Sequence, residues 1–315
     1  MRLFPLPLHA YAREPHSPKG LVLHALTFPL VLGTGVLLGV GNPLARLASA
    51  DGIHAVAFTL WPTAAAGLIL CAMGWMAHGT GSVNRRLAGF GLVAGAFGHA
   101  LPMLAAYWLA ARAGAGFASL SFTLTPVFTL AVMALLGREK LRPVRLMAVV
   151  LGMAGGLLLV GGQVWSLRLE PVFVGVALLV PTLIAGTNVY RGLSMPRTAP
   201  DAWLSAATLV GSALVLALLA PLAQGRQALP GGMGGACWLL IQTLVLVAGY
   251  LCYFALQRRA EPVAFSLIGY VMMLVSVGIG RVVFGESVAW TLWPATALIG
   301  AALWLIHRFP ARNAA

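Results

Sequence analysis

The sequence is poor in charged residues, and acidic side chains are the rarest of them. Only 7 of its 315 residues are Asp or Glu, and charged residues make up 9% of the chain, whereas ordinary soluble domains carry about 25%. Hydrophobic residues reach 60%, and the mean hydropathy is +0.92. This composition excludes an ordinary soluble domain and indicates a protein that crosses a membrane several times.

Cysteine is also sparse. Cys71, Cys237 and Cys252 lie in or beside apolar segments without CxxC spacing, which favours core packing over a disulfide framework or a metal site. The phosphate-binding pattern GxxxxGK[ST] is missing from the sequence, and the links between apolar segments are too short to hold a nucleotide-binding domain. We therefore expect no cofactor, no metal and no ATP chemistry.

Long apolar runs fill the chain. Ten segments approach or exceed the roughly 20 residues needed to cross a hydrocarbon core. We place them at about residues 21–47, 54–76, 88–110, 116–136, 144–163, 171–190, 202–223, 236–256, 262–284 and 290–306. Basic tails precede and follow them, over residues 1–20 and 307–315. The predicted fold is an all-α polytopic membrane protein with ten transmembrane helices.

The chain contains an internal repeat. The stretch from Tyr107 to Glu139 parallels the stretch from Tyr253 to Glu286, with the two glutamates 147 positions apart. The repeats span residues 21–163 and 171–306, with five segments in each. Because five is odd, the second copy enters the membrane in the opposite orientation. Inverted repeats of this kind are typical of secondary transporters that bind cargo between the two copies.

The basic residues separate by side of the membrane. When the loops are assigned alternately to two sides, fifteen of the 20 Lys and Arg residues fall on one side, Arg145 and Arg191 among them. The positive-inside rule then places both termini in the cytoplasm. The net charge of +13 is accordingly a membrane-insertion signal. The expected surroundings are a lipid bilayer, and no nucleic acid is expected as a partner because the charges form no single patch.

Short motifs recur at matching places in the two copies. Thr125–Phe128 is followed by Leu136–Glu139, and the second copy keeps the ending Phe284–Glu286 but lacks the proline. Gly41-Asn42 in the first segment corresponds to Gly186–Asn188 in the sixth. In these motifs the chain resembles the drug/metabolite transporter superfamily, specifically its ten-span EamA-like branch, over nearly its whole length.

The resemblance implies a function. Such proteins carry a small organic molecule by alternating access, most often as exporters in the inner membrane of a bacterium, and their central cavity is formed by spans 1, 3, 4, 6, 8 and 9. It also implies that Glu139 and Glu286 have structural roles at helix ends. The motifs say almost nothing about the substrate, and monomer and homodimer both stay open.

Polar side chains far from the span ends are the candidates for contact with cargo. His99 is the titratable side chain that we place at the membrane centre, and an imidazole with an unperturbed pKa of about 6.5 is suited to proton coupling. The alternative is a neutral histidine that links helices. Asn42 and Asn188 form an inverted pair whose amides suit polar cargo, or else cross-link helices.

The remaining candidates lie in the fourth, eighth and ninth spans: Thr123, Thr125, Pro126, Tyr250, Ser266 and Tyr270. None of the seven acidic residues falls in the middle of a span, so a permanently cationic drug would find no counter-ion. We expect neutral, zwitterionic or amphipathic cargo, amino-acid-like or drug-like. A membrane-embedded enzyme acting on lipid-type substrates and a non-transporting membrane partner protein are the alternatives.

Overall fold

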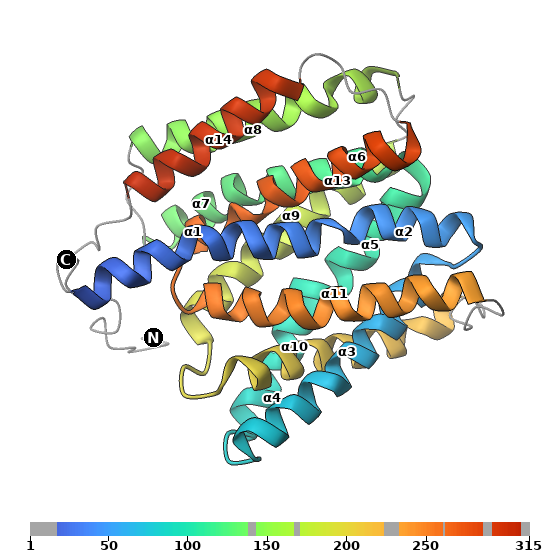
Figure 1. The fold of residues 1–315 in the computed structure, drawn as a ribbon, viewed down its shortest axis with the longest axis vertical. Helices are drawn as coiled ribbons and strands as arrows, with labels where there is room; N and C mark the ends of the chain where they lie inside the picture. The colour runs from blue at the N-terminus through green and yellow to red at the C-terminus, as the bar shows by residue number, and fades with distance from the viewer. Residues whose placement is uncertain are drawn as a thin grey trace.

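The structure, a computed structural model, describes residues 18–137, 143–166, 171–223, 233–260, 262–285 and 292–309, and the regular elements in these ranges are all helical (Figure 1). The first half contains α1 (Pro18–Gly39), α2 (Gly41–Ala50), α3 (Ala55–His78), α4 (Arg85–Gly95), the π-helix η2 (Ala96–Ala100), α5 (Leu101–Ala113), α6 (Ala115–Thr123), α7 (Thr125–Leu135) and α8 (Pro143–Ser166). The second half contains α9 (Pro171–Ser194), α10 (Asp201–Leu219), the 3-10 helix η3 (Ala220–Ala223), α11 (Met233–Gln257), α12 (Pro262–Ser266), α13 (Ile268–Phe284) and α14 (Leu292–Arg308).

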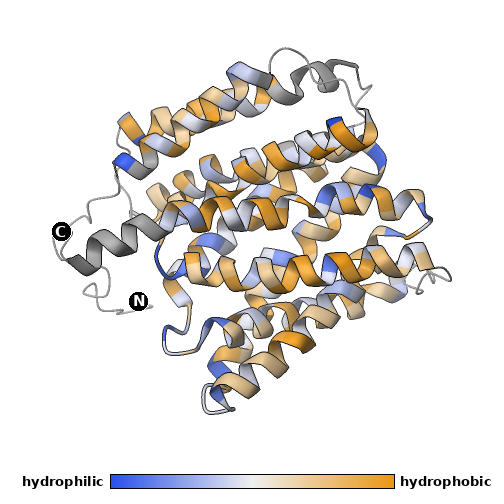
Figure 2. Ribbon diagram, in the orientation of Figure 1, coloured by the Kyte–Doolittle hydropathy of each residue, from blue (hydrophilic) through white to orange (hydrophobic). Residues whose placement is uncertain are grey.

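Eight of the helical segments are long and apolar enough to cross a membrane, and two shorter apolar helices, Pro143–Leu158 and Trp293–Leu305, lie where the fifth and tenth spans are expected. Apolar residues run along the helices, and hydrophilic residues are more common at their ends and in the loops (Figure 2). The all-helical membrane architecture is thus confirmed over the described ranges. The count of ten spans and the cytoplasmic placement of both termini stay predictions.

The helix packing repeats between the two halves. The first span packs through α1 on α11 and α13, and its counterpart α9 packs on α5 and α7. Equivalent spans also meet each other, because α3 packs on α10, α6 on α13 and α8 on α14. The α8–α14 pair lies along one edge of the molecule (Figure 1). This exchange of partners indicates a pseudo-two-fold relation, with the interface between the copies at the centre.

Glycine allows the closest helix contact. A Cβ atom on Gly91 would lie 2.4 Å from the carbonyl oxygen of Ala207, and one on Gly95 would lie 2.3 Å from the carbonyl oxygen of Thr208. These distances are too short for any side chain, so α4 and α10 touch through their backbones. Small residues at such crossings are the usual means of packing helices in lipid, where apolar burial gives little driving force.

Several spans are interrupted near their middle. The first breaks at Val40, the fourth at Leu124 and the ninth at Leu267, and the third changes to a π-helix at Ala96–Ala100, just before Pro102. Helix interruptions in a membrane protein are tolerated where the freed backbone groups are buried in protein or border a cavity. Here they surround the cavity described below.

The structure corrects one loop assignment. Arg191 was expected in a cytoplasmic loop, but it lies inside α9 with 0% of its surface exposed, because α9 extends four residues past the expected end of its span, to Ser194. Arg145, at the start of the expected fifth span, is also buried, with 2% of its surface exposed. Glu139 and Glu286 lie outside the described residues.

Candidate functional site: a central cavity between the repeats

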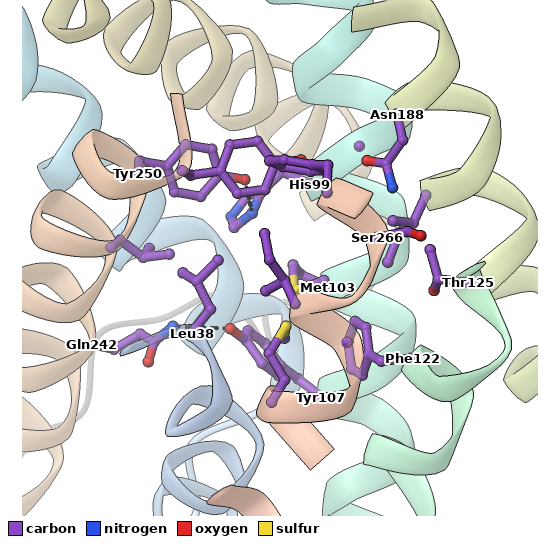
Figure 3. A pocket seen from close by; sticks show the side chains of 18 residues that line it. Leu38, His99, Met103, Tyr107, Phe122, Thr125, Asn188, Gln242, Tyr250 and Ser266 are labelled. Atoms are coloured by element: carbon purple, nitrogen blue, oxygen red, sulfur yellow. Dashed lines mark hydrogen bonds between the residues drawn. The ribbon is translucent and has the colours of Figure 1, made fainter. Parts of the chain in front are cut away.

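A cavity lies where the two halves meet. It is lined from α1, η2, α5, α6, α7, α9, α11, α12 and α13, and its empty volume is about 600 Å³ with its open part included (Figure 3). These helices belong to the first, third, fourth, sixth, eighth and ninth segments, the six that the resemblance implies. Most of the wall is apolar, with Leu38, Met103, Phe122, Leu246 and Met272 among its residues.

His99 lies in the π-turn η2 and lines the cavity, with 2% of its surface exposed. Its Nδ1 atom lies 2.8 Å from the hydroxyl of Tyr250, and its Nε2 atom lies 3.1 Å from the hydroxyl of Thr63. A hydroxyl can donate or accept, so either tautomer of a neutral imidazole is fully hydrogen-bonded. His99 therefore links helices and borders the cavity at the same time.

Three polar side chains gather on one side of the cavity: Asn188 from α9, Thr125 from α7 and Ser266 from α12 (Figure 3). Ser266 donates to the carbonyl oxygen of Val263 at 2.6 Å. Asn188 Oδ1 and Thr125 Oγ1 are buried and have no hydrogen-bond partner within the described part of the chain. A buried polar atom left unpaired costs about 1–3 kcal/mol, so this side of the cavity offers groups that a bound molecule can satisfy.

A second polar group lies across the cavity. Gln242 of α11 donates from Nε2 to the hydroxyl of Tyr107 at 2.9 Å (Figure 3), and its Oε1 atom is buried with no partner among the described residues. The sequence reasoning overlooked Gln242 as a site residue. Its signal was available, because it is a polar side chain near the middle of the eighth apolar segment. The cavity is thus amphipathic, with an apolar wall between two polar groups.

Behind the wall lies the guanidinium of Arg191. It donates from Nη2 to the carbonyl oxygen of Ala94 at 3.0 Å and from Nη1 to the hydroxyl of Tyr253. The guanidinium carbon lies 5.0 Å from the centre of the Tyr253 ring, and Tyr253 lines the cavity. The sequence reasoning missed this residue as well, although Arg191 follows Asn188 by three positions and so shares its helix face.

The profile of one protein family matches the chain twice, over residues 26–161 and 173–308. That profile is the EamA-like transporter family, and the two matches together cover most of the sequence. The chain belongs to the EamA-like transporter family. The resemblance drawn from the sequence motifs is thereby confirmed.

A solved structure shares the fold of this EamA-like protein. Its title is "Crystal structure of protein", and its sequence is 20% identical to this one. The match covers 89% of this chain and 96% of the other, and the TM-score is 0.68. The superposition shows a common fold, and at this identity it shows nothing about cargo. No curated protein matches the chain.

The structure brings together five of the nine candidate cavity residues of this EamA-like protein: His99, Thr125, Asn188, Tyr250 and Ser266. The other four, Asn42, Thr123, Pro126 and Tyr270, are buried elsewhere. Asn42 donates from Nδ2 to Ser119 Oγ at 2.9 Å and so links α2 to α6.

Two of these four face α8. Tyr270 donates to the carbonyl oxygen of Val149 at 3.1 Å. Thr123 lies against Gly156, where an added Cβ would be 2.9 Å from the threonine methyl group. Pro126 is buried at the start of α7. The repeat therefore relates the spans, but it does not tell which of their side chains face the cavity.

Among the described residues of this EamA-like protein, no three His, Cys, Asp or Glu side chains lie close enough together to hold an ion. Cys71, Cys237 and Cys252 are free thiols.

Proposed function

We propose that this EamA-like protein is a secondary transporter that exports small neutral, zwitterionic or amphipathic metabolites, amino-acid-like or drug-like, across a bacterial inner membrane by alternating access. The family is one of multi-pass membrane transporters. The observation that carries the proposal is the cavity, because its wall is built from both family copies and encloses polar groups that lack partners.

The chemistry of the wall supports this cargo class. Ligand sites commonly combine an apolar lining with a few polar groups that fix orientation, and this cavity has aliphatic and aromatic side chains between the Asn188 and Gln242 groups. An apolar body would pack against the wall while a polar end pairs with one of the amides. Among the described residues, neither amide oxygen has a hydrogen-bond partner, so both can accept from neutral donors such as amides and hydroxyls.

Proton coupling through His99 is part of the proposal. The imidazole borders the cavity and is hydrogen-bonded to hydroxyl groups at both nitrogens. Hydroxyl groups can reverse their donor and acceptor roles, so both bonds can rearrange when the ring gains a proton. Alternation between the two charge states would connect cargo movement to a proton gradient.

The deciding experiment is uptake into proteoliposomes of a pooled set of labelled amino acids, sugars, nucleosides and amphipathic drugs, with and without an imposed proton gradient. Protein-free liposomes are the control. We expect flux of one chemical class that increases with the gradient. Flux that ignores the gradient would instead indicate uniport or exchange, and no protein-dependent flux of any class would count against transport.

The His99→Gln variant tests the coupling. Glutamine keeps a donor and an acceptor for Thr63 and Tyr250 but does not titrate, so we expect flux to continue and to lose its response to the pH gradient. The comparison is the ratio of fluxes with and without the gradient, measured in wild type and variant at equal protein density. An unchanged ratio would eliminate His99 as the coupling residue.

A further inference from the structure

Arg191 is a fully buried cation inside the sixth span, with none of its surface exposed. Among the described residues, its hydrogen-bond partners are both neutral, the carbonyl of Ala94 and the hydroxyl of Tyr253, and its Nε atom has no partner. A charge taken out of water is costly unless an opposite charge accompanies it. Buried ionisable groups in membrane spans are for that reason functional candidates.

Within the described ranges, the two acidic side chains are engaged elsewhere. Asp51 accepts from the Trp238 indole at 2.6 Å, and Asp201 is paired with Arg258. Among the residues that the structure describes, none that lines the cavity is Asp or Glu. Over the described chain the charge on Arg191 is therefore not balanced by a carboxylate of the protein.

Only a thin wall separates this charge from the cavity. Gly98 lines the cavity, and a Cβ atom added there would lie 2.3 Å from Arg191 Nη2. The guanidinium thus fills the space that any other side chain at position 98 would need. Gly98 therefore lies between the guanidinium and the cavity, and in a medium of low dielectric constant a charge is screened less than in water.

Tyr253 connects Arg191 to the cavity, because it lines the cavity and its hydroxyl is hydrogen-bonded to the guanidinium. Its hydroxyl oxygen accepts a hydrogen bond from Arg191 Nη1, which leaves its own proton free to be donated. Asn188 lines the cavity one helical turn before Arg191, and Thr125 lies on the same side of the cavity as Asn188 (Figure 3). The amide of Asn188, the Thr125 hydroxyl and the Tyr253 hydroxyl are the donors that an acceptor group would meet on this side.

We propose that the cavity binds cargo through a carboxylate group, held beside Asn188 and Thr125 and balanced by the charge of Arg191. This rests on the proposed transport function and narrows its cargo to molecules with an apolar body and a carboxylate, either simple acids or zwitterions. Arg191 acts through Tyr253 and through its field, so it is a positioning and specificity residue.

The test is binding by purified full-length protein in nanodiscs of four probes with one apolar body: 3-phenylpropanoate, its neutral amide 3-phenylpropanamide, L-phenylalanine and 2-phenylethylamine. We expect 3-phenylpropanoate to bind at least tenfold more tightly than the amide, and the amine to bind most weakly. Comparison of phenylalanine with 3-phenylpropanoate tells whether a zwitterion or a simple acid is preferred, and either preference supports the proposal.

Three variants separate charge from structure. Arg191→Gln keeps hydrogen-bonding groups but removes the charge, and we expect it to abolish the preference for acid over amide. Arg191→Lys keeps the charge and should keep the preference. Arg112→Gln changes the net charge equally, at a guanidinium that lies over Trp108 and outside the cavity lining, and should behave as wild type. Size-exclusion profiles and melting temperatures establish that each variant is folded.

The proposal is overturned if the wild-type protein binds the acid and the amide with equal affinity, or if it binds no carboxylate probe. Both results come from the wild-type protein, so they do not depend on whether a variant folds. The proposal is also overturned if folded Arg191→Gln prefers the acid over the amide as strongly as wild type does. Because binding is measured without flux, a carboxylate site in a protein that moves no cargo would refute only the transport function. Transport of amide and acid with equal affinity would refute only the carboxylate site.

Discussion

At the scale of single residues, the two repeat-related asparagines have different roles. Asn188 lines the cavity with an unpaired Oδ1 atom, whereas Asn42 donates to Ser119 inside the helix packing. We expect Asn188→Leu to reduce cargo flux by about tenfold, the loss of one good hydrogen bond, with little change in melting temperature. Asn42→Leu should instead lower stability by about 1–3 kcal/mol. Cargo flux and thermal unfolding are measured for both variants. Equal effects of the two substitutions on flux and on melting temperature would contradict the different roles of Asn188 and Asn42.

Sequence periodicity and repeats predict which segments cross the membrane, but not which way a side chain points. The repeat relates Asn42 to Asn188 and Thr123 to Tyr270. A rotation of less than one helical turn nevertheless decides whether a position faces the cavity or a neighbouring helix. Arg191 shows a second limit. A basic residue near a span end reads as a loop anchor, and only the extension of α9 to Ser194 makes it a buried charge.

At the scale of helices, the close contact between α4 and α10 depends on glycine, which has no side chain. A Cβ atom on Gly95 would lie 2.4 Å from the backbone nitrogen of Ser212, while one on Gly89 of the same helix would meet nothing within 4 Å. Gly95→Ala should therefore lower stability by about 1–3 kcal/mol through overpacking. Gly89→Ala should be neutral or stabilising by up to about 1 kcal/mol, because alanine favours helix. Thermal unfolding in one detergent compares the two, and similar melting temperatures would show that α10 simply moves aside.

At the scale of the whole molecule, alternating access requires that contacts between the two halves break and re-form. Asp51 and Trp238 join the halves through a 2.6 Å hydrogen bond at the start of α11 and the end of α2. In a background with Cys71, Cys237 and Cys252 changed to Ala, Asp51→Cys and Trp238→Cys can be bridged by a short bifunctional thiol reagent. We expect bridging to stop flux and leave cargo binding intact, since it holds one end closed without touching the cavity. Each single-cysteine variant, treated alike, controls for the modification itself. Undiminished flux through the bridged protein would mean that this end of the molecule stays together during transport, and that the halves separate only elsewhere.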